Sequence, residues 1–335
     1  MSPLIIGVAQ FVVCSAAILL SGVRLSRYGD IIAEKTGLGG SWIGLILLAT
    51  VTSLPELVTG ASSIVLYDVV DIAAGDVIGS CLFNLLILAL LDVRHPVPLS
   101  ARIHQGHVLS AGFGIVQLGL LAMALVAGGL MPVLGWIGLP SLLFLGVYAF
   151  AVRTIFVFER ARVTELAEEM TGEIRYGEIT LRRAALYFGV AAAALVGAAT
   201  LLPGAAERIS HATGLDESFV GTLFVAASTS LPAVVVAGAA MRIGAIDMAA
   251  ANLFGSNLFN VAVLGVDDVL YVRGPLLADV ARIHLLTLAG AIVMTGIAII
   301  GLTYRAKKKR YRLSWDSLAS LGVYVICVVL LARWG

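Results

Sequence analysis

Residues 36–58 read TGLGGSWIGLILLATVTSLPELV, and residues 213–235 read TGLDESFVGTLFVAASTSLPAVV, with 11 of 23 positions identical. A second pair follows: residues 71–84, DIAAGDVIGSCLFN, match residues 247–260, DMAAANLFGSNLFN, at 8 of 14 positions. Apolar composition does not explain shared Pro, Thr-Ser, Gly-Ser and Asn at fixed spacing. The chain therefore contains an internal duplication.

The composition around these copies is that of a membrane protein. Of the 335 residues, 60% are hydrophobic and 13% are charged, and the mean hydropathy is +1.01. Soluble domains have roughly 45–50% apolar and about 25% charged residues. The values exclude a soluble enzyme, a nucleic-acid-binding protein and a disordered chain. Three cysteines lie in apolar runs and are predicted to be buried thiols: Cys14, Cys81 and Cys327.

Apolar segments long enough to cross a bilayer, which takes about 20 residues per helix, recur along the chain. There are ten: 4–23, 41–66, 69–91, 105–128, 131–156, 184–203, 218–241, 246–270, 283–303 and 314–332. They predict an all-α integral membrane protein with two five-helix units, 1–156 and 184–335. A polar linker, 157–183, joins the units, and its ELAEEM segment predicts a short surface helix.

The loop charges predict the orientation of the spans. Of the 22 Lys and Arg residues, 18 fall in alternate loops starting after the first span, and 4 fall on the other side. The positive-inside rule then places the linker in the cytoplasm and both termini outside. Because each unit has an odd number of spans, the second is inverted relative to the first, as in many secondary transporters. We expect a multi-pass protein of the plasma (inner) membrane.

The duplicated segments hold the most polar part of the membrane region. Pro55 and Pro232 lie inside spans, and each leaves the carbonyl four residues earlier without its usual donor. We expect spans 2, 3, 7 and 8 to be broken, with freed carbonyls available to a cation. Around the breaks lie candidate ligands from both copies: Thr52, Ser53, Glu56, Asp76, Thr229, Ser230 and Asn252.

These candidate ligands are oxygen donors, which hard cations such as Na⁺ and Ca²⁺ prefer. Glu56 and Asp76 are the carboxylates predicted near mid-bilayer, where a charge costs at least about 2.5–3.5 kcal/mol. Such residues persist mainly for a pathway or a site, and a protonated structural acid is the alternative. Other acids fall near span ends, where solvated or helix-capping roles are expected: Asp92, Asp247, Asp267, Asp268 and Asp316. His104 and His284 are expected to anchor helix starts.

At these residues the chain resembles the sodium/calcium exchanger family of the calcium/cation antiporter superfamily. The family motifs TS-x-P-E and G-[ND]-x-x-G-S-N-x-F-N appear as TSLPEL with GDVIGSCLFN, and as TSLPAV with ANLFGSNLFN. The resemblance covers essentially the whole chain. It implies ten helices, with two long tilted helices outside a core of broken ones. It also implies alternating access by sliding of the outer helices, and Ca²⁺ export driven by Na⁺ entry without a cofactor.

The resemblance also implies roles for individual residues. Glu56 matches the acidic ligand of the first repeat, and Asp76 and Asn252 match the polar pair of the third and eighth helices. The matching hydroxyl and carbonyl ligands are Thr52, Ser53, Thr229 and Ser230. Three positions depart from the family pattern: Ala233 replaces the second glutamate, and Ile72 and Met248 replace serines.

These departures leave the coupling ion, Na⁺ or H⁺, and two other functions open. A monovalent cation/proton antiporter on the same fold is one alternative, and a non-transporting membrane ion-binding scaffold is the other. An intramembrane enzyme is disfavoured because the hydroxyls lack a His or Lys base in the spans and the carboxylates lack a zinc site. The expected partners are membrane lipid and metal cations, without nucleic acid, and the chain is expected to function as a monomer.

Overall fold

The computed structural model describes residues 2–36, 51–170, 179–242 and 244–334, with their side chains except at 33, 34 and 159–170. The main helices are α1 (Pro3–Lys35), α3 (Leu54–Ser62), α4 (Val70–Leu91), α5 (His107–Ala127), α6 (Leu139–Met170), α7 (Leu181–Thr213), α10 (Leu231–Arg242), α11 (Ile246–Leu270), α12 (His284–Tyr304) and α13 (Trp315–Trp334). Shorter elements are α8 (Glu217–Val220), α9 (Ala226–Thr229), the π-helical η1 (Ser63–Tyr67) and η5 (Gly221–Val225), the 3₁₀ turns η2 (Asp92–Arg94), η3 (Leu99–Ala101), η4 (Gly128–Leu130) and η6 (Leu276–Ala278), and the strands β1 (Val133–Leu134) and β2 (Ile137–Gly138).

Most of the described helices are suited to cross a membrane. Eight are long and apolar enough, and the pair Glu217–Thr229 and Leu231–Arg242, bent by 44°, makes a ninth if it is one span. The segment Leu54–Tyr67 is a shorter apolar helix. The part of the predicted span 41–66 that precedes residue 51 lies outside the described residues. The chain is thus all-α and multi-pass.

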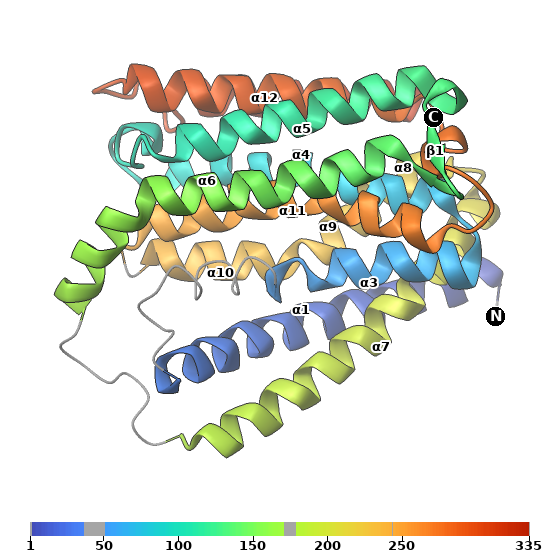
Figure 1. Cartoon of the computed structure of the whole chain (residues 1–335), viewed down its shortest axis with the longest axis horizontal. Helices are drawn as coiled ribbons and strands as arrows, with labels where there is room; N and C mark the ends of the chain where they lie inside the picture. Colours follow the sequence, from blue (N-terminus) through green and yellow to red (C-terminus); the bar gives the residue numbers. More distant parts are fainter. Residues whose placement is uncertain (1, 37–50, 171–178, 243, 335) are drawn as a thin grey trace.

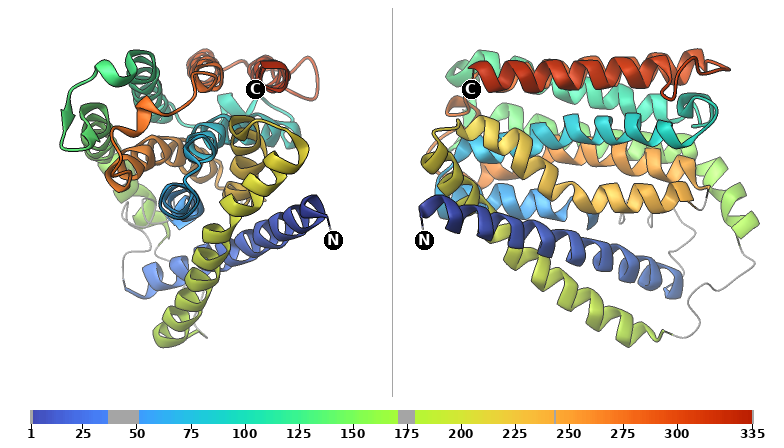
Figure 2. Two further views of the ribbon diagram at one scale, coloured as in Figure 1. Left: turned by 90° about the vertical axis from the view of Figure 1, so that its right-hand side faces the viewer. Right: turned by 180° about the vertical axis from the view of Figure 1, so that it is seen from behind.

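The helices form a core bundle with a separate outer layer. α1 and α7, each 33 residues long, cross one another beside the rest of the helices (Figures 1 and 2). α4 and α11 lie in the core: 83% and 78% of their apolar windows are buried, against 17–44% for the other spanning helices. Two long helices outside a core of other helices are what the family resemblance implied.

The expectation that spans 3 and 8 are broken is wrong. α4 and α11 are continuous over 22 and 25 residues. The glycines of α4 serve close packing instead: a Cβ at Gly79 would lie 2.3 Å from the carbonyl oxygen of Thr222. Within the described residues, spans 2 and 7 are the interrupted ones, at Ser53 and Ser230, immediately before the Leu-Pro pairs.

Two boundaries of the first half also differ from the prediction. Residues 131–138 are not helical but contain the β1–β2 hairpin, in which Val133 pairs with Gly138 and Gly135 has φ +68°. At the other end, α6 continues to Met170. The ELAEEM segment is therefore the last part of this helix and not a separate surface helix.

Matching hydrogen bonds join the two halves. Asp92, after α4, accepts from the backbone N–H of Leu99 and of Ser314, both at 2.7 Å. Asp268, near the end of α11, accepts from Leu276 N–H at 2.5 Å and Gly138 N–H at 2.7 Å. Each acid therefore holds a turn of its own half and the start of the last helix of the other half.

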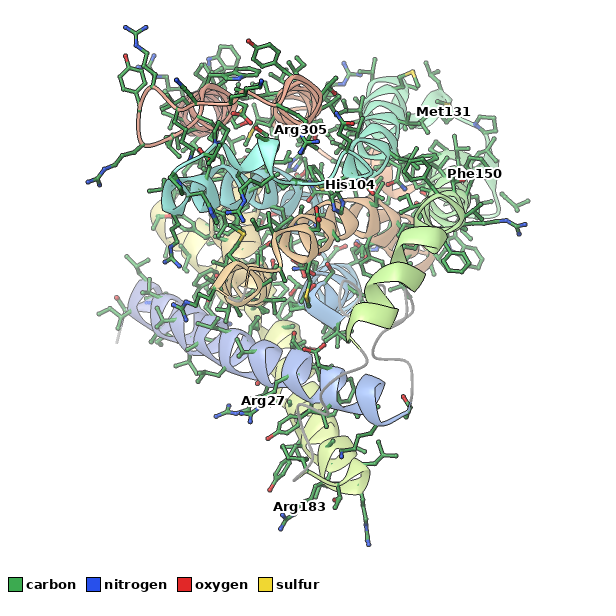
Figure 3. The ribbon with its side chains drawn as sticks, turned by 90° about the vertical axis from the view of Figure 1, so that its left-hand side faces the viewer. Arg27, His104, Met131, Phe150, Arg183 and Arg305 are labelled. Atoms are coloured by element: carbon green, nitrogen blue, oxygen red, sulfur yellow. The ribbon has the colours of Figure 1, made fainter. Side chains whose placement is uncertain are left out.

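A second matching set of contacts joins the starts of the core helices to the opposite half. Asp247 accepts from the backbone N–H of His104 at 2.7 Å, and Asp71 accepts from the backbone N–H of Ala281, the matching position, at 2.8 Å. Nε2 of His284, the first residue of α12, lies 3.2 Å from Asp71 Oδ1, which confirms the expected anchoring role of His284. His104 lies before α5, and its contact with Asp247 is made by its backbone. The two chain termini lie at one end of the bundle (Figure 1), and Figure 3 looks onto the other end, where Arg27, Arg183 and Arg305 lie.

Candidate functional site

The two interrupted helices bring polar side chains onto the buried core helices. The backbone has φ −99° and ψ 9° at Ser53, and φ −81° and ψ −5° at Ser230. In an α-helix, ψ is about −42°. Pro55 and Pro232 remove the N–H that would continue the hydrogen-bond ladder across each break. The residues beside the breaks are thus free to make contacts between the halves.

Asp76 lies on α4, wholly buried, facing the break of the second half. Its Oδ1 accepts a hydrogen bond from the Thr229 hydroxyl at 2.7 Å. The close packing of Gly79 against η5 allows this contact, because a side chain there would push α4 away from the helix that carries Thr229. Asp76 Oδ2 is also buried and has no hydrogen-bond partner in the described part of the chain.

Glu56 lies on α3 in the first half and also reaches the break of the second half. The hydroxyl of Ser230 donates to Glu56 Oε1 at 3.2 Å, and the glutamate is 2% exposed. Like Asp76, it keeps one buried carboxylate oxygen, Oε2, without a partner within residues 2–36, 51–170, 179–242 and 244–334. Each acid therefore has a buried oxygen that no described group binds.

A chain of hydroxyls connects the two carboxylates. Ser80 of α4 lies 3.0 Å from the Ser230 hydroxyl and 3.5 Å from the Thr229 hydroxyl. Ser80 thus lies between the groups that bind Glu56 and Asp76. Ser80 is not among the ligands predicted from the sequence, and its position in the repeated Gly-Ser pair is the available indication.

The matching positions of the other copy make a smaller polar group. The Thr52 hydroxyl donates to Asn252 Oδ1 at 3.0 Å, which matches the Thr229–Asp76 bond. Ser53 matches Ser230, but residue 233 is alanine where the first copy has Glu56. Accordingly, the buried Ser53 hydroxyl has no partner among the residues that the structure describes.

The seven candidate residues are therefore all buried at the two breaks and the core helices facing them, with direct contacts between residues from opposite halves. Among the described residues, no three His, Cys, Asp or Glu side chains gather as a metal-binding group. The donors are instead two carboxylates, hydroxyls and an amide, an oxygen set suited to a hard cation. The three cysteines are buried and free.

Two acids near span ends do not behave as expected. Asp92, Asp247 and Asp268 accept backbone hydrogen bonds, in agreement with a structural role. Asp267, in contrast, is wholly buried, and neither of its carboxylate oxygens has a partner among the described residues. Asp316 is 7% exposed, and its Oδ1 is buried without a described partner. The prediction of a solvated or capping acid is wrong at Asp267, and Asp316 is not solvated.

The chain is similar to known membrane proteins over most of its length. It is 26% identical over 268 residues to the inner membrane protein YrbG of Escherichia coli, covering 78% of each chain. It is 25% identical to the putative antiporter CaxA of Alkalimonas amylolytica, covering 78% of this chain and 80% of that one. Its fold is similar to the structure of the sodium-calcium exchanger NCX_Mj soaked with Na⁺ and Ca²⁺, with a TM-score of 0.62, 20% identity and coverage of 97% and 98%.

The sodium/calcium exchanger protein model matches residues 6–157 and 183–333, which include both duplicated segments. The family and the fold are those of secondary transporters. The chain is a multi-pass integral membrane protein and belongs to the sodium/calcium exchanger family.

Proposed function

We propose that the protein is a secondary active antiporter that exports Ca²⁺ in exchange for Na⁺ or H⁺ by alternating access. The observation that carries the proposal is the pair of buried acids, Glu56 and Asp76, joined by one chain of hydroxyls. Each keeps an oxygen without a partner. Together their two negative charges neutralise one Ca²⁺, and the surrounding oxygens are ligands that Ca²⁺ prefers.

The proposed ligands are Glu56 and Asp76 with five polar residues from both halves: Thr52, Ser53, Thr229, Ser230 and Asn252. All seven are at most 3% exposed. This enclosure supports an occluded site, in which the ion exchanges water for protein oxygens. The transported ions are the only small-molecule partners proposed, and no cofactor is needed.

The proposed architecture is ten spans in two inverted five-helix repeats, 1–156 and 184–335, with linker 157–183 in the cytoplasm and both termini outside. The matching roles of Asp92 and Asp268 in the two halves support the repeat. The shared location of both termini supports their common side (Figure 1). We place the chain as a monomer in the plasma (inner) membrane, in contact with lipid and without nucleic acid.

The outer layer supplies a route to alternating access. α1 and α7 pack on one another as an outer layer, and the layer also contacts α3 and α10 of the core (Figure 2). The Ser15 hydroxyl of α1 lies 2.9 Å from the Ser228 hydroxyl, two residues before the break at Ser230. Sliding of the α1–α7 layer over the core would therefore act on the backbone beside the ion ligands, exposing them to one side at a time.

A monovalent cation/proton antiporter is the second candidate. It is favoured by Ala233, which removes the second glutamate and leaves the Ser53 hydroxyl unpartnered. Ile72 and Met248 also replace serines of the family pattern, which reduces the number of ligands available to accompanying ions. A non-transporting ion-binding scaffold is the third candidate, and it would bind cations without gradient-driven flux.

Flux in proteoliposomes separates these functions. Purified protein is reconstituted, and Na⁺, H⁺ and K⁺ gradients are imposed one at a time while radioactive Ca²⁺ uptake is measured. The proposal expects Ca²⁺ uptake with a Na⁺ or H⁺ gradient and none with ionophore-collapsed gradients. Movement of Na⁺, K⁺ or Li⁺ without Ca²⁺ supports the second candidate. Cation binding without any flux supports the scaffold.

A further inference from the structure

Asp267 is an acid that the proposed central site does not use. It is 0% exposed on α11, and both oxygens lack a hydrogen-bond partner among the described residues. It packs on the backbone of α3: a Cβ at Gly60 would lie 2.4 Å from Asp267 Oδ2. An ionised carboxylate in such surroundings is unfavourable unless a counter-charge reaches it.

The position of Asp267 connects it to the central site. Gly60 is four residues beyond Glu56 on α3, so it lies one helical turn, about 6 Å, further along the helix axis. Asp267 therefore lies about one helical turn beyond Glu56 along this side of α3.

Polar atoms without partners mark the same face of α11. Asn252, Ser256, Asn260 and Asp267 are spaced by 4, 4 and 7 residues, which keeps them on one side of a helix with about 3.6 residues per turn. Each is buried and carries at least one polar atom without a hydrogen-bond partner in the described structure. The stripe runs from the central site toward the end of the bundle that holds both termini (Figure 1).

The matching stripe of α4 ends differently. Asp76, Ser80 and Asn84 match the first three positions, but the position that matches Asp267 is Leu91. The next residues in each half, Asp92 and Asp268, make equivalent backbone hydrogen bonds, which fixes this alignment. Opposite them, Gly60 corresponds to Ala237, and both Leu91 and Ala237 belong to the main apolar cluster. The extra acid thus exists on one side of the molecule only.

We propose that the Asp267 carboxylate is a cation-binding group on the path between the central site and the membrane face that carries the termini. It accepts the transported cation, a hard ion such as Ca²⁺, as the ion passes between Glu56 and that face. The inference rests on the proposed transport function. It adds a cation-binding step at one membrane face, the face that carries the termini. Removal of this carboxylate weakens cation capture from one face and leaves capture from the other face unchanged.

Transport kinetics measured separately at the two membrane faces test this site. Wild type and Asp267→Asn, which keeps the shape and removes the charge, are reconstituted with a C-terminal tag. Vesicles with the tag outward are selected on affinity resin, and those with the tag inward form the second population. The KM for Ca²⁺ applied outside is measured for each. We expect Asp267→Asn to raise KM about tenfold or more at the face with the termini, as expected for loss of a charged ligand, and to change it less than about twofold at the other face.

Two further variants exclude simple misfolding. Asp267→Leu introduces the residue found at the matching position of α4, Leu91, so the variant is compatible with a helix packed in this way. It should show the same loss of cation capture at one face. The double variant Leu91→Asp/Ala237→Gly copies the Gly60–Asp267 pair into the other half and should lower KM at the opposite face.

The outcomes distinguish this site from the proposed function. A transporting wild type with unchanged KM in both Asp267 variants contradicts the site alone and identifies a protonated structural carboxyl. Equal losses at both faces contradict the sided path. A wild type that moves no cation contradicts the proposed function and this site together.

Discussion

Glu56 in the first half accepts a hydrogen bond from Ser230. The matching position of the second half holds Ala233, and the matching hydroxyl, Ser53, has no partner among the described residues. The carboxylate of Asp76 likewise faces Thr229, whereas its counterpart is the neutral Asn252 facing Thr52. Both mid-membrane acids thus come from the first half, and the hydroxyls that bind them come from the second. The duplication produces two similar halves, and the residues that differ between them determine where the negative charge of the site lies.

The largest effect is expected from removing the acid that has no counterpart. Glu56→Gln should reduce Ca²⁺ flux to the background of empty liposomes, because a cation site with one carboxylate cannot neutralise a divalent ion. The matched control is Glu207→Gln, a partly exposed carboxylate on the outer helix α7. Wild-type flux in Glu56→Gln protein that inserts normally would remove Glu56 from the site.

A difference between the halves also exists outside the site. Asp92 pairs with Lys309 at 2.8 Å, with both side chains at most 5% exposed, whereas Asp268 has only backbone donors among the described contacts. Lys309→Met should lower the free energy of unfolding by about 3–5 kcal/mol, as for a broken buried ion pair. The exposed neighbour Lys308 provides the control. Lys308→Met should change the free energy of unfolding by less than about 0.5 kcal/mol. Equal thermal unfolding of the two variants in detergent would mean that the Lys309 pair contributes no stability.

Moving the charge between the halves tests whether total charge or position matters. Asp76→Asn should weaken Ca²⁺ binding by about tenfold or more, since a hydrogen bond to a charged group contributes about 1.5–3 kcal/mol. The swap Asp76→Asn/Asn252→Asp keeps two acids in the site and should recover part of the affinity. Calorimetric titration of both variants measures this. A swap no better than the single variant would show that Asn252 does not face the ion.

The smallest effect is expected where the second half regains its acid. Ala233→Glu gives Ser53 the partner that Ser230 has in Glu56 and adds a third carboxylate to the site. Ca²⁺ affinity should increase by several-fold, up to about tenfold for roughly 1.4 kcal/mol. Ala233→Gln restores the hydrogen bond without the charge and should give a smaller gain. Unchanged affinity in the glutamate variant would place residue 233 away from the ion.

The sequence predicted the parts of this fold that repeat. TSLPEL and TSLPAV located the breaks at Ser53 and Ser230, since Pro55 and Pro232 each remove a backbone N–H there. The sequence does not show that α4 is unbroken. Its Gly75 and Gly79 pack closely on η5, and a glycine required for close packing and a glycine at a kink look alike in sequence. The two kinds of glycine can be distinguished only when the backbone that packs against each one is known.

For the site, residue type predicted the candidate ligands but not their pairing. The sequence could not show that Ser80 lies between Ser230 and Thr229, because that contact joins residues 150 positions apart. Asp267 was misjudged for a related reason: its distance from the helix end suggested solvent, whereas the packing of α3 at Gly60 buries it. Such contacts depend on how the two halves fit together.

The central claim is that the two halves together hold one cation between Glu56 and Asp76. The direct measurement is an experimental structure of the protein at saturating Ca²⁺, with anomalous scattering used to locate the ion. We predict one anomalous peak about 2.3–2.6 Å from Glu56 Oε2 and Asp76 Oδ2, the usual distance for calcium–oxygen ligands. A peak at another position, or none at saturation, would contradict the account.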